Sequence, residues 1–272
     1  ETETGEYPKY WPADLHMVGK DILRFHAVYW PAFLMAADLP LPKRVFAHGW
    51  WTNEGEKISK SLGNVIDPRE LVEKYGLDQV RYFLLREVPF GNDGDFSDAA
   101  IISRMNSELA NDFGNLAQRV LSMVAKNCDG KVPAPGEFTA EDQEMLGATL
   151  TAADALRDNM DKQLFHIGLD ALWAVIRQAN AYVDHHAPWK LRKEDPPRMA
   201  TVLYVLAECI RRLALLNQPF MPDTMAKMLD QLAVPDDQRT IHLHLSDEYQ
   251  LVAGQELPKP EGLFPRFQVE EN

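Results

Sequence analysis

The sequence predicts an α/β segment followed by an all-α segment. In the first part, two short apolar runs flank one amphipathic stretch between residues 14 and 47, in the order strand, helix, strand. From residue 101 onward, apolar residues recur every three or four positions, which is the period of a helix with one buried face. Residues 89–98 lie between these parts and are rich in turn formers, which predicts a boundary there.

The α/β segment is predicted to contain two parallel strands. Residues 14–18 form the first strand and residues 44–47 form the second. A helix is expected between them over residues 20–37, with a kink near Pro31 because proline cannot donate the helical hydrogen bond. A strand–helix–strand unit of this size favours parallel pairing.

The carboxyl ends of these strands are the expected ligand edge of the sheet, where residues 19–21 and 48–51 should meet. Gly19 lets a ligand approach the backbone closely, and the carboxylate of Asp21 can accept both hydroxyl groups of a ribose. The same Gly-Lys-Asp triplet also fits a simple turn with a helix cap. It indicates a nucleotide site only together with the lysines described below.

Two short helices are predicted to follow. Asp67 is placed to cap the first, Pro68 to occupy its first turn, and Glu70 to complete the capping pattern. Gly76 is expected to end this helix. The second helix is expected over residues 78–86.

The all-α segment is predicted to be an antiparallel bundle, because long helices joined by short loops pack side by side in opposite directions. A Pro- and Gly-containing linker, residues 131–136, interrupts it, and Thr139 is placed to cap the next helix. The last part of the chain is expected to be extended and to pack back on the body. The expected helices cover residues 101–120, 140–159, 162–186, 197–217 and 222–232.

Composition limits the possible functions. The net charge of −13 argues against a general nucleic-acid binder, so any RNA affinity should be salt-sensitive and confined to one face. No apolar run approaches the roughly 20 residues that span a bilayer, and a membrane role is not expected. Cys128 and Cys209 fit no metal spacing and are typical of reduced thiols in the cytoplasm.

The most informative motif is Lys57-Ile58-Ser59-Lys60-Ser61, followed by Leu-Gly-Asn. Two lysines three residues apart, with serines and a glycine, predict a cationic loop. Flexible ammonium groups of this kind stabilise a phosphoryl or nucleotidyl group as charge develops on it. A solvated basic surface loop is the other interpretation of these five residues taken alone.

Ile22, Phe25 and His26 share one face of the predicted helix. They are either a core stripe or one wall of a pocket for an apolar side chain, with His26 at its rim.

Asn111, Asn115 and Arg119 recur every four residues and predict a polar ridge opposite the apolar stripe. Asn and Arg side chains read base edges well, although a solvated helix face has the same pattern. Trp189, which follows Pro188 at a helix end, suits stacking on an unpaired base, and a capping hydrophobe is its structural alternative.

Several stretches, in one order along the chain, closely resemble methionyl-tRNA synthetases, a family of class I aminoacyl-tRNA synthetases. The loop at residues 57–61 resembles the KMSKS motif of that class, with isoleucine in place of methionine. The other resembling stretches are residues 11–16, 19–26, 30–32, 48–52, 81–86, 111–119, 187–189 and 263–266.

The resemblance implies a fold and an activity. Residues 1–66 would be the C-terminal half of a Rossmann-like catalytic domain, and residues 67–98 a connecting region like the family's stem-contact part. Residues 99–235 would be the helical-bundle anticodon-binding domain, and residues 236–272 a tail packed on the body. The family joins methionine to tRNA-Met in two steps, through a methionyl-adenylate made from ATP.

The resemblance also implies site residues. Lys57, Ser59 and Lys60 would act in adenylate formation, with magnesium accompanying ATP. The methionine pocket would include Ile22, Phe25 and His26. The remaining implied contacts to ATP are Gly19, Asp21, His48, Trp51, Ile58 and Lys60, and those to the CAU anticodon are Asn111, Asn115, Arg119, Pro188 and Trp189.

The chain departs from the family pattern in what it lacks. No His-Ile-Gly-His element, first half of the nucleotide fold or zinc knuckle occurs in the sequence. The chain is therefore expected to be the C-terminal part of a monomeric enzyme, inactive without its N-terminal half and without a zinc site. A stand-alone, non-catalytic tRNA-binding module is the alternative. Another class I synthetase, such as the cysteinyl or isoleucyl enzyme, fits the ridge and Trp189 less well.

Overall fold

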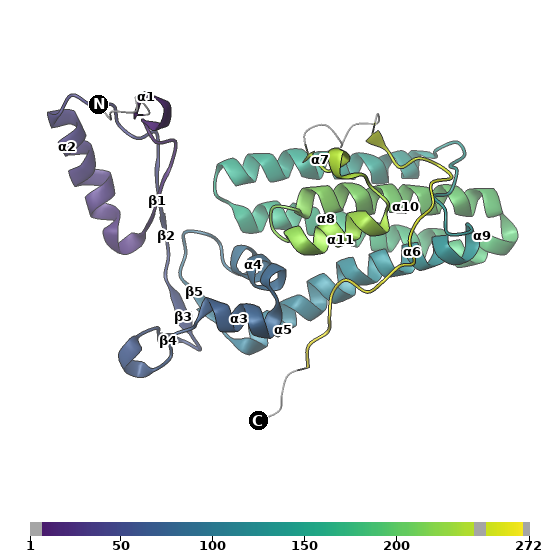
Figure 1. The fold of residues 1–272 in the computed structure, drawn as a ribbon, viewed down its shortest axis with the longest axis horizontal. Coiled ribbons are helices and arrows are strands. Elements are labelled where there is room, and N and C mark those ends of the chain that lie inside the picture. Colours follow the sequence, from purple (N-terminus) through teal and green to yellow (C-terminus); the bar gives the residue numbers. More distant parts are fainter. Residues whose placement is uncertain (1–6, 242–248, 269–272) are drawn as a thin grey trace. The chain divides into compact units, whose positions relative to one another are not determined.

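The computed structural model describes residues 7–241 and 249–268 (Figure 1). The chain divides into two compact units. Unit 1 comprises Glu1–Ile66 and Glu87–Ser97, and unit 2 comprises Asp67–Arg86 and Asp98–Asn272. The expected connecting region, residues 67–98, is thus shared between the units.

Unit 1 contains the predicted pair of parallel strands. After the short helix α1 (Tyr7–Tyr10), strand β1 (His16–Gly19) pairs with β2 (Val45–His48), and Gly19 lies opposite His48 in the register. The parallel arrangement predicted from the strand–helix–strand order is therefore confirmed.

The connection between β1 and β2 is not one kinked helix. It is a 3₁₀ turn (Lys20–Ile22), a π-helical turn (Phe25–Tyr29) and the α-helix α2 (Trp30–Ala36). Pro31 stands in the first turn of α2, where a missing N–H costs no hydrogen bond. The irregularity thus precedes the proline, and the expectation of a single helix over residues 20–37 was wrong in this respect.

A second small sheet completes unit 1. Strand β3 (Trp51–Asn53) pairs antiparallel with β4 (Glu56–Lys57) and parallel with β5 (Gly94–Phe96). Residues 89–98 were predicted only as turns, and β5 was missed because its glycine and aspartate residues are unfavourable in strands. A Cβ atom at Gly94 would lie 2.5 Å from Val88 and 3.2 Å from Trp51, so glycine permits this close packing.

Unit 2 begins with the two predicted short helices. Helix α3 (Pro68–Tyr75) is capped by Asp67, whose side chain accepts a 2.8 Å hydrogen bond from the Arg69 backbone. It ends at Gly76, which has a φ of +94° that favours glycine. Helix α4 is Leu77–Arg86. Both predictions are confirmed.

A long helical stretch follows, with a change of geometry in its middle. Helix α5 (Asp98–Arg104) leads into a π-helical segment (Met105–Gly114), which continues as α6 (Asn115–Asn127). The helix expected over residues 101–120 is present, but the sequence period did not reveal its π-helical part. Such segments are rare in proteins and frequent at functional sites.

The remaining helices of unit 2 surround α10. Helix α10 (Pro196–Asn217) packs against α6, α7, α8, α9 and α11, and every residue from Thr201 to Asn217 is buried. The C-terminal tail returns to unit 2, where the Leu257 backbone donates a 2.8 Å hydrogen bond to the Gly130 carbonyl in the loop after α6. Helix α9 was not predicted separately. The other helices are α7 (Ala140–Asp161), α8 (Phe165–His186), α9 (Pro188–Glu194) and α11 (Pro222–Gln231).

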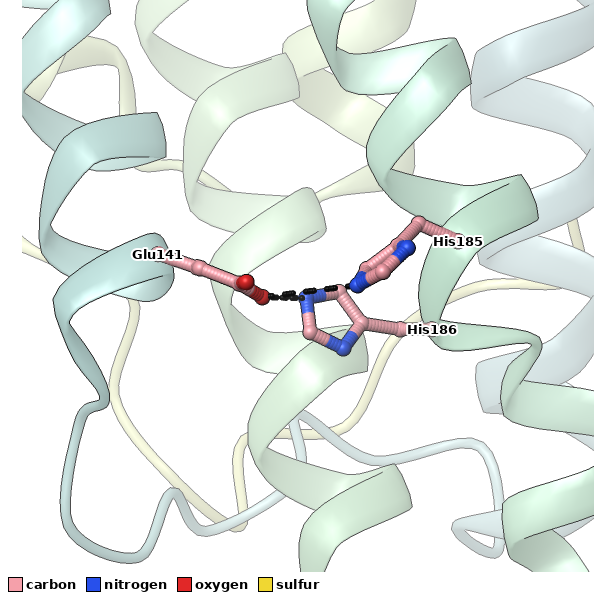
Figure 2. Close-up of side chains that lie close together, drawn as sticks. All are labelled: Glu141, His185 and His186. Carbon is pink, nitrogen blue, oxygen red and sulfur yellow. Dashed lines mark ion pairs between the residues drawn. The ribbon is translucent and has the colours of Figure 1, made fainter.

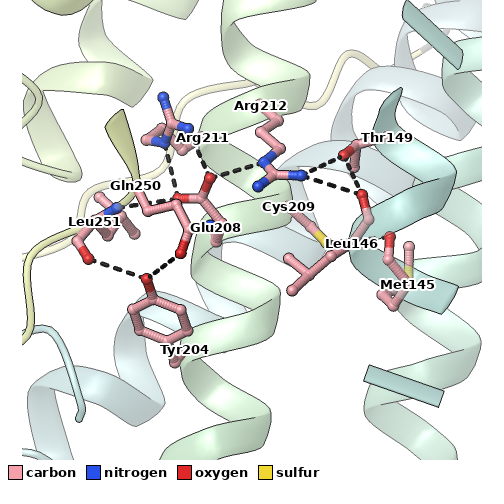
Figure 3. Close-up of polar contacts among 10 residues, drawn as sticks. All are labelled: Met145, Leu146, Thr149, Tyr204, Glu208, Cys209, Arg211, Arg212, Gln250 and Leu251. Atoms are coloured by element: carbon pink, nitrogen blue, oxygen red, sulfur yellow. Dashed lines mark hydrogen bonds and ion pairs between the residues drawn. The ribbon is translucent and has the colours of Figure 1, made fainter. Parts of the chain in front are cut away.

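One buried charge cluster ties α10 to the tail (Figure 3). Glu208 accepts hydrogen bonds from Arg211 at 2.6 and 2.8 Å, from Arg212 at 2.8 Å and from the Leu251 backbone at 3.2 Å. Both arginines and Glu208 are almost fully buried. Within the part of the chain that the structure describes, no helix is long and apolar enough to cross a membrane.

Candidate functional sites

The carboxyl ends of β1 and β2 form the first candidate site, in unit 1. Gly19 and His48 are register partners, so the two predicted segments do meet at one edge. A Cβ atom at position 19 would lie 2.5 Å from the Asp21 Oδ1 atom and 3.9 Å from His48 Cε1. The absence of a side chain at Gly19 therefore leaves the Asp21 carboxylate close to the strand end and open beside His48.

Lys20, Trp50 and Asp93 complete this edge; the sequence placed the first two there without a role and did not single out Asp93. The Lys20 ammonium forms a 2.6 Å ion pair with Asp93, which also accepts a 2.8 Å hydrogen bond from the Trp50 backbone. Lys20 lies 4.4 Å from the centre of the Trp50 ring and Lys57 lies 6.0 Å from it. The hydrogen bond from Lys20 and that from Trp50 lower the pKa of Asp93. The site is therefore a cationic edge around an exposed indole.

His48 and Trp51 have structural contacts in this site. The His48 Nδ1 atom lies 2.9 Å from the Gly49 carbonyl, and its ring stacks on Phe90 at 5.9 Å. Trp51 is half-buried beside Gly94. His48 ends β2 and Trp51 begins β3, within residues 48–51 that the sequence placed at this edge.

The loop that carries the two lysines is closed by one asparagine. The Asn64 side chain accepts a 2.9 Å hydrogen bond from the Ser59 backbone and donates one of 3.1 Å to the Lys57 carbonyl. The hydroxyl groups of Ser59 and Ser61 lie 2.8 Å apart. Asn64 gives the loop a defined shape, and sequence reasoning did not assign it a role.

Of the two lysines in this loop, the structure describes the side chain of Lys57 only. Lys57 is exposed at the end of β4, and Ile58 is half-buried. The backbone of residues 60–62 forms a 3₁₀ turn. The side chain of Lys60 lies outside the described part of the structure.

An apolar cavity of about 580 Å³ lies in unit 1, beside the π-helical turn. Its rim includes His26, whose Nδ1 atom lies 3.0 Å from the Ile22 carbonyl. A carbonyl oxygen only accepts, so Nδ1 carries the proton and Nε2 is the acceptor of a neutral ring. Ile22 itself does not line the cavity. The lining residues are His16, Phe25, His26, Tyr29, Trp30 and Phe33.

The second candidate site, in unit 2, brings together residues from two helical stretches. The Arg119 guanidinium lies 5.8 Å from the Trp189 ring centre and pairs with Asp184 at 2.7 Å. Trp189 is 46% exposed, and Asn115 is exposed one turn before Arg119. The juxtaposition of the predicted ridge with the tryptophan is therefore present in the structure.

The side chains of the other two residues predicted for this surface, Asn111 and Pro188, are less accessible to a ligand. Asn111 is exposed, but its side-chain oxygen accepts a 2.5 Å hydrogen bond from Arg266 in the C-terminal tail. Pro188 is buried and opens α9. Ala187 joins α8 to α9 in a left-handed conformation, with φ of +43°. This corner sets the direction in which Trp189 leaves the bundle.

Comparison with known proteins defines first the class and then the family. Residues 1–121 match a family model described as class I tRNA synthetases (M). Residues 132–272 match the anticodon-binding domain of methionyl-tRNA ligase, and this match covers more than half of the chain. The chain therefore belongs to the methionyl-tRNA ligase family.

Relatives and solved structures agree with this assignment. The chain is 58% identical over 264 residues to the methionine–tRNA ligase of Brucella suis biovar 1, covering 97% of the chain and 51% of that protein. It is 52% identical to the Mycobacterium leprae enzyme, covering 100% and 51%. The structure of Mycobacterium tuberculosis methionyl-tRNA synthetase in complex with methionyl-adenylate superimposes with a TM-score of 0.91 at 51% identity, covering 98% and 52%. The chain thus spans about half the length of the relatives it matches.

Proposed function

We propose that the chain is part of a methionine–tRNA ligase, which activates methionine with ATP and transfers it to tRNA-Met in the cytoplasm. The mixed α/β and largely helical fold and the family matches support this proposal. In this interpretation, unit 1 contributes the second half of a Rossmann-like catalytic domain. Unit 2 contributes the antiparallel helical bundle that binds the anticodon.

Unit 1 is proposed to bind ATP at the strand ends. The Asp21 carboxylate beside Gly19 would accept the ribose hydroxyl groups, while His48, Trp51 and Ile58 would border the adenine. Carboxylate recognition of ribose hydroxyl groups is the common solution in dinucleotide folds. Magnesium would accompany the triphosphate.

The loop at residues 57–64 is proposed to stabilise charge during adenylate formation. Lys57 and Lys60 would approach the phosphates as negative charge develops, and Ser59 would help to shape the loop. The support is geometric: Asn64 follows the turn at residues 60–62, and its side chain forms hydrogen bonds with the backbone of Lys57 and Ser59 before the turn. A loop held in one shape loses less conformational entropy when it closes on a ligand.

The aromatic cavity is proposed to receive the methionine side chain. Phe25 and His26 line it, and contacts between a thioether and aromatic rings are favourable. Ile22, which does not line the cavity, would act indirectly, because its carbonyl oxygen accepts the hydrogen bond from His26 Nδ1.

The observation that carries the proposal for unit 2 is the Arg119–Trp189 pair. A guanidinium 5.8 Å from a half-exposed indole leaves the other face of the ring for a base. Asn115 and Asn111 would read base edges from the same helical stretch, with Pro188 fixing the start of α9. The net charge of −13 confines phosphate contacts to this local surface.

The rest of the ligase is the proposed partner of unit 1. Of the exposed large apolar side chains in the described residues, more than half precede residue 42. Many exposed apolar side chains in one short stretch of chain are typical of an interface. We propose that the part of the relatives that this chain does not span covers it in a monomeric enzyme. A two-lysine loop has no use in a stand-alone RNA-binding module, so the catalytic interpretation is preferred.

Anticodon reading is tested by fluorescence anisotropy of the chain with an anticodon stem-loop. The CAU loop should bind more tightly than a scrambled loop at low and at physiological salt. Trp189→Ala should weaken CAU binding by about 1–3 kcal/mol, the contribution of one stacked base. Trp50→Ala is the matched control, because Trp50 is 47% exposed but lies in unit 1. Equal binding of both loops would reject the proposal.

Adenylate formation is tested in the full-length ligase. Lys60→Ala should slow methionine-dependent pyrophosphate exchange by at least about a hundredfold, as expected when a transition-state charge contact is lost. Lys43→Ala is the control, since Lys43 is an exposed lysine of the same unit that pairs with Asp14. An unchanged exchange rate in the Lys60 variant would show that the loop does not act on the phosphates.

A further inference from the structure

Three potential metal ligands converge where α7 begins and α8 ends (Figure 2). Glu141 lies in the first turn of α7, and His185 and His186 lie in the last turn of α8. The Glu141 Oε2 atom is 3.1 Å from His186 Nε2 and 3.7 Å from His185 Nε2. One oxygen atom thus faces two imidazole nitrogens, and the three ligand atoms lie within 4.8 Å of one another.

These distances suit a shared metal ion. Zinc binds histidine nitrogen and carboxylate oxygen at about 2.0–2.2 Å in tetrahedral geometry, which separates neighbouring ligand atoms by about 3.3–3.5 Å. The observed 3.1 and 3.7 Å lie on either side of this range. Glu141 and His185 are exposed, so their side chains are free to rotate toward a common ion.

The ring of His186 is held in place by its neighbours. It packs on Tyr182 with the ring centres 4.2 Å apart, and the Tyr182 hydroxyl donates to Asp142. Asp142 in turn accepts hydrogen bonds of 2.5 and 2.7 Å from Arg198. A ligand whose orientation is already set loses little entropy on binding metal.

The nitrogen of His186 that faces the cluster lacks a hydrogen bond. Its Nε2 atom is shielded from solvent and has no hydrogen-bond partner among the described residues, although Glu141 lies nearby. A shielded nitrogen that makes no hydrogen bond is unfavourable, and coordination of a metal ion would satisfy it.

We propose that Glu141, His185 and His186 bind a transition-metal ion of the zinc type and thereby clamp the start of α7 to the end of α8. Two imidazoles and one carboxylate suit zinc or cobalt, whereas magnesium and calcium prefer oxygen ligands. Three protein ligands leave a coordination position for water. The proposal departs from the expectation of a chain without a zinc site, which rested on the cysteines, because this cluster contains no cysteine. The proposal is independent of tRNA ligation.

The test is metal binding by the chain without an affinity tag. Calorimetry with Zn²⁺ should show one ion per chain, and Co²⁺ should give the visible absorption of a four- or five-coordinate site. His185→Gln and Glu141→Gln should each lower the affinity at least about tenfold, because each removes one of three protein ligands. Bound Zn²⁺ should also raise the melting temperature of the parent but not of these variants.

Two matched controls make the result specific. His166→Gln changes a histidine at the opposite end of α8, and Glu144→Gln changes an exposed acid one turn further along α7. Both should bind Zn²⁺ like the parent. No stoichiometric binding by the parent, or equal binding by the His185 and Glu141 variants, would show that the cluster is only an ion pair.

Discussion

Glu208→Gln should destabilise unit 2 strongly while leaving the shape of the side chain almost unchanged. The Glu208 carboxylate takes four hydrogen bonds, three from guanidinium groups and one from the Leu251 backbone, at 2.6–3.2 Å (Figure 3). Arg211 and Arg212 are 1% exposed, so the variant removes the negative charge that Glu208 supplies to two buried cations. Removing one partner of a buried ion pair costs about 3–5 kcal/mol. The glutamine side chain also places an N–H group against partners that are themselves hydrogen-bond donors.

The free energy of unfolding is measured by urea titration followed by far-UV circular dichroism, since the long helices belong to unit 2. Glu144→Gln is the control: it removes the same charge from an exposed position of α7 and should change stability by no more than about 0.5 kcal/mol. Replacing Glu208, Arg211 and Arg212 together by leucine and methionines should recover much of the loss, because the three buried charges are then removed together. A loss below about 1 kcal/mol for Glu208→Gln would refute the reasoning.

Three further predictions concern the loop, a thiol and acid stability. Asn64→Ala removes both side-chain hydrogen bonds that close the loop, each of which contributes about 0.5–1.5 kcal/mol of stability. Amide hydrogen exchange in residues 57–64 should therefore accelerate, and unchanged exchange would contradict this role of Asn64. Burial raises the pKa of Cys209 to about 12, so its thiol should resist alkylation at pH 8 until the chain unfolds, as peptide mapping would show. Burial raises the pKa of Asp98, but hydrogen bonds from Lys74 and Tyr75 outweigh it and lower the pKa below the unfolded value. This stabilisation is present above about pH 4 and is lost as the pH falls through the folded pKa, so the stability difference between parent and Asp98→Asn should vanish in acid.

The sequence determined those features that depend on neighbouring residues. Asp67 caps α3 and Gly76 ends it, because a cap needs only its own turn of helix. Thr139 begins α7 through a capping box with Asp142 for the same reason. The parallel pairing of β1 and β2 followed from the helix between them, and it brought Gly19 opposite His48.

Other features needed contacts between distant parts of the chain. Asp93 reaches Lys20 and Trp50 from the segment before β5, which shows no strand pattern of its own. Arg266 donates a hydrogen bond to the Asn111 side chain, although more than 150 residues of sequence separate the two. Neither contact leaves a local pattern, because each is made by side chains that only the packing of their elements brings together.

The metal-ligand cluster shows the same division most clearly. The pair His185–His186 is visible in the sequence, but a doublet of histidines on a helix is more often solvated than coordinated. Only the packing of α7 along α8 places Glu141 within 3.1 Å of one ring. Sequence thus determined the ends of α3 and the start of α7, whose hydrogen bonds lie within a few residues. Tertiary structure decided which side chains share a site, because burial and long-range packing set those distances.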